Sequence, residues 1–212
     1  ITENESGKYS PEWFYNEAQK PEWIAFIRKA DTLHENFINH FGIEHLKSLS
    51  GKELLTSLFY NDKGNKLNLC YVLEMDKDMR EIFGSIAGGA AYKFGLFFHK
   101  KTQSWTCGSP AKPVKLTENE AIQKAEEIRN DLVAGAEIIS SFGPLDSEED
   151  YEQLYKQLEH IPGINMVWRM KYYQMLFPAL FAPFYGQDIQ LRVLHFLNQK
   201  PSDIPFIRMG QI

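Results

Sequence analysis

The chain has 212 residues, of which 43% are hydrophobic and 14% aromatic, and its formal net charge is −5. This length is sufficient for a domain with a substantial core, and the composition excludes a disordered chain. No apolar run approaches the roughly 20 residues of a membrane-spanning helix. The chain has two separated cysteines, Cys70 and Cys107, which exclude a disulfide scaffold and favour the cytoplasm.

The N-terminal part, residues 1–60, has the pattern of helices. Pro11 and Pro21 each open an amphipathic segment, as proline does at the first helical position, and Gly42 suits the end of the second helix. Ser50 and Glu53 have capping-box spacing before a short helix that ends near Phe59.

The middle part, residues 61–116, is predicted to be a small antiparallel sheet. A turn at 60–66 precedes an alternating strand at 67–75, and a second alternating strand covers 92–99. A turn at 100–103 with two lysines leads into a third strand at 104–108, which gives a β-hairpin with a basic tip. We expect a loop at 109–115.

The glycine-rich segment 84–95 does not have the spacing of a phosphate-binding loop. Gly84 and Gly89 are correctly separated, but Ala90 stands where a P-loop requires lysine, and the next lysine is Lys93. The segment therefore leads into a strand, and no nucleotide site is predicted.

The C-terminal part, residues 117–212, is predicted to be helical. Thr117 and Glu120 form a second capping-box pattern, at the start of a long helix within 116–143. Further helices are expected within 146–161 before Pro162 and Gly163, over 164–177 before Pro178, and within 187–202. The prediction is one compact α+β domain, with a small antiparallel sheet flanked by helices. Because the chain begins at Ile1, we expect a module of a longer protein.

Enzyme chemistry is not indicated by any motif. His34, His40 and His45 do not share a helix face, and neither HExxH nor G-x-S-x-G occurs. No lysine has Asp or Glu two positions before it, which is the spacing of common metal-dependent nucleases. We expect no catalytic residue, no metal site and no cofactor.

The charges are segregated along the chain. There is no acid between Glu81 and Glu118 or between Glu159 and Asp188. A β-ribbon with basic residues fits a DNA groove, although lysines at a hairpin tip are commonly only solvated. The candidate DNA-binding residues in these two stretches are Lys93, His99, Lys100, Lys101, Lys112, Lys115, Arg169 and Lys171.

The C-terminal stretch 164–212 resembles a block that precedes the AAA+ motor in McrB-type proteins of modification-dependent restriction systems. The residues that carry the resemblance are Trp168, Lys171, Tyr172, Leu176, Phe177, Pro178, Arg208, Gly210 and Gln211. The stretch from Leu69 to Trp105 is similar to the sheet region of their N-terminal segments. Together these stretches cover about two-thirds of the chain.

The resemblance implies a recognition module that binds double-stranded DNA, often at a methylated or otherwise modified base. A GTP-hydrolysing AAA+ motor and a separate nuclease subunit would supply the enzymatic activities. Readers of modified bases hold the base between aromatic side chains, for which the candidates are Tyr92, Trp105 and Trp168. The alternative is an assembly module that docks another protein through an apolar aromatic patch at 168–185.

Overall fold

The computed structural model describes residues 11–59, 67–86, 91–109 and 111–212. The predicted turn at 60–66 and much of the glycine-rich segment, residues 87–90, lie outside these ranges. The chain divides into two compact units, residues 1–39 and residues 40–212, and each is described by itself. That the 212 residues form a single module remains a prediction.

The first unit contains helix α1 (Pro11–Ala18) and most of helix α2 (Pro21–Phe41). Both begin at the predicted prolines, and Gly42 follows the second, as expected. Within α2, the rings of Trp23 and Phe26 contact each other edge to face, with centroids 5.8 Å apart.

Four short helices open the second unit: α3 (Ile43–Ser48), α4 (Gly51–Leu58), α5 (Leu69–Glu74) and α6 (Lys77–Phe83). The strand predicted at 67–75 is wrong, since α5 occupies this segment. Asn68 caps α5 by accepting a hydrogen bond from the backbone N–H of Tyr71, and Leu69, Val72 and Leu73 are buried at helical spacing. The alternation that predicted a strand depended on Leu67 and Met75, which are exposed.

The second unit also contains the sheet, of order β1-β2-β3 and antiparallel throughout. A short 3₁₀ helix, η2 (Ala91–Phe94), precedes β1 (Leu96–His99), β2 (Ser104–Ser109) and β3 (Lys112–Leu116). The hairpin with its turn at 100–103 is confirmed. Two expectations are wrong: residues 91–94 are helical, and the loop predicted at 109–115 largely forms β3, which pairs with the free edge of β2.

The C-terminal helices are α7 (Glu118–Ser141), α8 (Glu148–Leu158), α9 (Val167–Leu176), α10 (Gln187–Phe196) and α11 (Pro205–Gln211). The capping box of Thr117 and Glu120 is confirmed at the start of α7. The equivalent prediction for Ser50 and Glu53 is wrong, because the Ser50 side chain makes no capping bond. Helix α11 was not predicted, although Pro205 stands at its first position.

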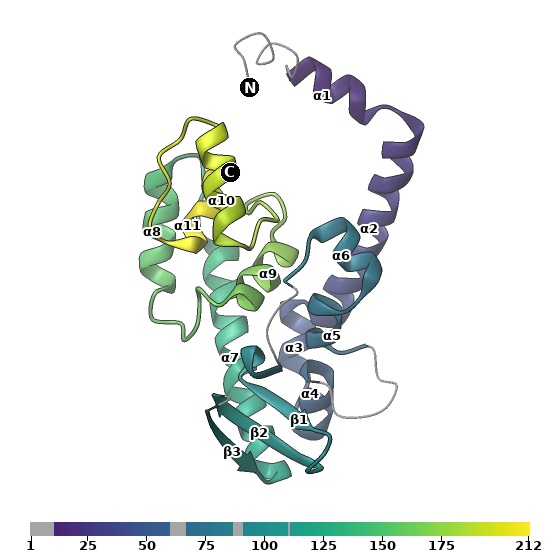
Figure 1. Cartoon of the computed structure of the whole chain (residues 1–212), viewed down its shortest axis with the longest axis vertical. Coiled ribbons are helices and arrows are strands. Elements are labelled where there is room, and N and C mark those ends of the chain that lie inside the picture. The colour runs from purple at the N-terminus through teal and green to yellow at the C-terminus, as the bar shows by residue number, and fades with distance from the viewer. Residues whose placement is uncertain (1–10, 60–66, 87–90, 110) are drawn as a thin grey trace. The chain divides into compact units, whose positions relative to one another are not determined.

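Helix α7 is the central element of the second unit. It contacts α3, α4, α8 and α9 as well as all three strands, and in Figure 1 it extends from behind the sheet toward α8 and α9. Its buried residues include Ala121, Ala125, Ile128 and Leu132, which are three or four positions apart and share one helix face. The predicted α+β class is confirmed: helices predominate, with one small antiparallel sheet.

No helix in the described ranges combines the length and the apolar character needed to cross a membrane.

Candidate nucleic-acid interface

The two faces of the sheet differ in chemistry. Side chains alternate between faces along each strand, so Leu96 and Trp105 share one face, which packs on α7. Both are buried, with 1% and 5% of their surface exposed, and the Trp105 ring contacts Phe98 with centroids 5.3 Å apart. Around Leu96 and Trp105, this face belongs to the core.

The opposite face, here called the outer face, carries aromatic and basic side chains. Its central row is Phe97, Thr106 and Lys115, which are register partners across the three strands. Phe97 is partly exposed and Lys115 is exposed. The Phe97 ring contacts Tyr92 of η2 at a centroid distance of 4.4 Å and His99 at 6.4 Å. Three rings therefore form one continuous cluster, and Lys115 lies on the same face, two strands away.

The hairpin tip continues this surface. Lys100 and Lys101 are exposed, and side-chain bonds shape the turn between them and β2. The Thr102 hydroxyl lies 2.9 Å from Nδ1 of His99, and the Gln103 amide donates to the backbone oxygen of Lys100 at 2.7 Å. These bonds order the turn that carries both lysines.

The β3 strand carries two further exposed lysines: Lys115 lies on the outer face, and alternation places Lys112 on the opposite face. Among the residues that the structure describes, Lys101, Lys112 and Lys115 take part in no ion pair. The strands and their turns contain no acid. Like charges gathered on one small sheet produce a positive local potential, although the whole chain is acidic.

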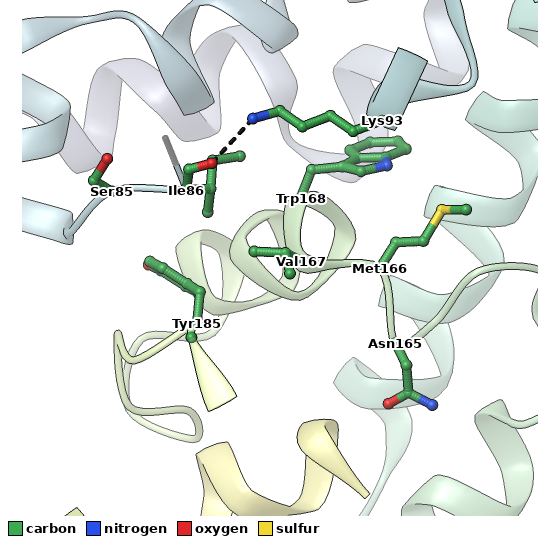
Figure 2. A pocket seen from close by; sticks show the side chains of 9 residues that line it. Ser85, Ile86, Lys93, Asn165, Met166, Val167, Trp168 and Tyr185 are labelled. Atoms are coloured by element: carbon green, nitrogen blue, oxygen red, sulfur yellow. Dashed lines mark hydrogen bonds between the residues drawn. The ribbon is translucent and has the colours of Figure 1, made fainter. Parts of the chain in front are cut away.

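Lys93 lies away from this surface. Its ammonium group forms an ion pair with Glu74 at 2.6 Å and donates to the backbone oxygen of Ile86 at 3.0 Å. In this position it lines a pocket of about 520 Å³, together with Ser85, Ile86, Asn165, Met166, Val167, Trp168, Tyr185 and Gly186 (Figure 2).

Arg169 and Lys171 are buried in α9, with 5% and 0% of their surface exposed. Arg169 donates to a carboxylate oxygen of Asp131 at 3.3 Å and to the backbone oxygen of Pro162. Lys171 donates to the backbone oxygen of Gly84 at 2.7 Å. Burial lowers the pKa of Lys171 to about 8. Arg169 and Lys171, both predicted to contact DNA, therefore point into the protein.

The candidate stacking residues are also separated. Trp105 lies on α7, and Trp168 is 3% exposed and contacts Phe94 at a centroid distance of 5.5 Å. Only Tyr92 belongs to the outer-face cluster, where its neighbour is Phe97, a residue that sequence reasoning did not select. Strand alternation could have found Phe97, because it places this ring opposite Leu96 and Phe98.

The residues of the McrB-type resemblance make internal contacts. Tyr172 donates from its hydroxyl to the backbone oxygen of Phe41 at 2.9 Å, and Arg208 donates to the Gln190 side chain at 2.9 Å. The Gln211 side chain accepts a hydrogen bond from the backbone N–H of Ser202. Five rings of the predicted docking patch, Trp168, Tyr172, Tyr173, Phe181 and Tyr185, are buried, whereas Phe177 and Phe184 are partly exposed.

Within the described residues, no group of three or more His, Cys, Asp or Glu side chains is arranged to hold a metal ion. Comparison with protein-family models, with curated proteins and with solved structures gives no match.

Proposed function

We propose that this chain is the DNA-binding specificity module of a McrB-like restriction protein, and that it acts in the cytoplasm. The observation that carries the proposal is the set of exposed lysines, Lys100, Lys101, Lys112 and Lys115, on a sheet whose strands and turns contain no acid. Such a surface attracts the phosphates of double-stranded DNA, and lysine is a common phosphate ligand.

The hairpin supplies the contact with the duplex. The tip lysines lie at the turn between β1 and β2, at one end of the three-stranded sheet, where they can contact phosphates beside the groove. Phosphate contacts position the module, while recognition of a base, modified or not, requires contacts to the base itself. The chain's role is recognition, and an AAA+ motor and a nuclease subunit provide GTP hydrolysis and cleavage.

Binding of a labelled duplex over a range of salt concentrations tests the proposal. Each phosphate contact lowers log K by about 0.9 for each unit of log salt. The double variant Lys100→Glu, Lys101→Glu should therefore bind more weakly to every sequence. Its slope of log K against log salt should be shallower by about 2. Methylated and plain duplexes measured in parallel should keep their affinity ratio.

The matched control is Lys156→Glu, Lys200→Glu, which changes net charge equally at exposed lysines of α8 and the segment after α10. It should bind like the wild type at moderate salt. If a folded tip variant keeps the affinity and the slope, the hairpin is not a DNA surface, and the assembly-module alternative takes its place.

A further inference from the structure

The outer face of the sheet has a feature that phosphate binding does not require. The rings of Tyr92, Phe97 and His99 are partly exposed and in mutual contact, with centroid distances of 4.4 Å and 6.4 Å. On the α7 side, Trp105 is buried in the core and Phe98 is partly exposed. The outer cluster therefore leaves ring surface accessible on the face that also carries Lys115.

We propose that this cluster is a stacking platform for unpaired bases, so that the preferred ligand is DNA with a single-stranded tract. The inference rests on the proposed function, because it assigns a ligand class to the same sheet. Bases stack on exposed aromatic rings regardless of sequence, since every base has a π-face. In a continuous duplex the neighbouring base pairs cover those faces, so a fully paired site cannot use the platform.

The positions of the charges fit a strand lying across the outer face. Lys115 is the register partner of Thr106, which is in turn the partner of Phe97, so one exposed cation lies two strands from the central ring. Lys100 and Lys101 lie beyond His99, at the tip of the hairpin. Bases can occupy the rings while phosphates lie against lysines at both sides, which is the arrangement of grooves that bind single strands.

The packing around Phe97 keeps the platform in place. Tyr92 and His99 both contact the Phe97 ring edge to face, and His99 is held by the bond between its Nδ1 and the Thr102 hydroxyl. A platform ordered before binding loses less conformational entropy when a base stacks on it.

The experiment compares a labelled duplex with the same duplex carrying a central bubble of mismatched thymines. We expect the wild type to bind the bubble about tenfold more tightly, which lies within the range reported for stacking of one base. The variant Phe97→Leu keeps an apolar side chain but removes the ring. It should lose most of this preference, while the salt slope on the plain duplex stays unchanged.

The control variant is Phe98→Leu, which removes the neighbouring ring from the α7 side of β1. It should retain the preference for the bubble, and circular dichroism establishes that each variant is folded. If Phe97→Leu does not fold, Tyr92→Leu replaces it, with the same expected result.

The outcomes separate the two proposals. If the wild type binds duplex and bubble equally, or if folded Phe97→Leu keeps the preference, the stacking platform is wrong and the DNA-binding proposal stands. If the wild type binds neither the plain duplex nor the bubble duplex at low salt, the proposed function is wrong, and the stacking platform is wrong with it.

Discussion

The ammonium group of Lys171 donates a hydrogen bond to the backbone oxygen of Gly84, 87 positions earlier in the chain, at 2.7 Å. Gly84 ends α6 with a φ of 76°, in the left-handed region that favours glycine. Tyr185 strengthens the same connection, since its hydroxyl donates to the backbone oxygen of Phe83 at 2.7 Å and its ring lies 5.5 Å from the ammonium group. Lys171 of α9 and Tyr185, just before α10, thus fix the end of α6.

Burial of Lys171 predicts an unusual dependence of stability on pH. Its pKa is about 8 in the folded chain against 10.5 for an ordinary lysine. Between these values the unfolded chain binds a proton that the folded chain does not, so the free energy of unfolding rises with pH. Relative to Lys171→Met, the wild type should gain about 2 kcal/mol between about pH 7 and pH 9.5.

Urea unfolding of both proteins across this pH range measures the effect. Groups that the two proteins share cancel in the comparison, including the buried tyrosines Tyr172 and Tyr185, whose pKa burial raises. A difference between the proteins that does not change with pH would show that Lys171 has an ordinary pKa.

The two predicted capping boxes should respond differently to the loss of their hydroxyl. The backbone N–H of Glu120 donates to the Thr117 hydroxyl at 3.3 Å, and the carboxylate of Glu120 accepts from the backbone N–H of Thr117 at 2.7 Å. Thr117→Ala should lower the free energy of unfolding by about 1 kcal/mol. Ser50→Ala should change it by less than about 0.5 kcal/mol, because the Ser50 side chain makes no capping bond. Equal effects in chemical denaturation would contradict the assignment.

Gly210, which belongs to the McrB-type resemblance, is required by packing. A Cβ at this position would overlap the ring of Tyr151, which is held by a hydrogen bond from its hydroxyl to the backbone oxygen of Leu180. We expect Gly210→Ala to cost about 1–3 kcal/mol, the range for overpacking. Gly143→Ala is the control, since a Cβ there meets no atom within 4 Å. The measurement is the melting temperature, and an unchanged value for Gly210→Ala would show that Tyr151 moves aside freely.

Trp105 should contribute to stability and not to base selectivity. It is 5% exposed on the α7 side of the sheet, so Trp105→Ala should cost about 3–5 kcal/mol. Val114→Ala, on the same face but 52% exposed, should change stability by less than about 1 kcal/mol. A stable Trp105→Ala protein that lost selectivity for modified DNA would restore this ring as a base contact.

Local patterns in the sequence determined the elements whose signals come from neighbouring residues. Helix starts were predicted at Pro11, Pro21 and Thr117. The φ angle of proline and the hydrogen bonds of a capping box involve only residues within one helical turn. The hairpin with its tip at Lys100 and Lys101 was predictable for the same reason, since its two strands are adjacent in the chain. The absence of acid from 82–117 is likewise a property of the sequence alone.

The tertiary structure decided which side chains reach the surface, because burial depends on residues far apart in the chain. Lys171 has the same charge as Lys115, but its partner is Gly84 and its side chain is buried, whereas Lys115 is exposed. Segment 67–75 alternates like a strand, yet Leu69, Val72 and Leu73 are buried at helical spacing, and the α-helix satisfies its backbone hydrogen bonds locally. The sequence shows which cationic and aromatic residues the chain contains. Packing against α7 and α9 decides which of them stay exposed.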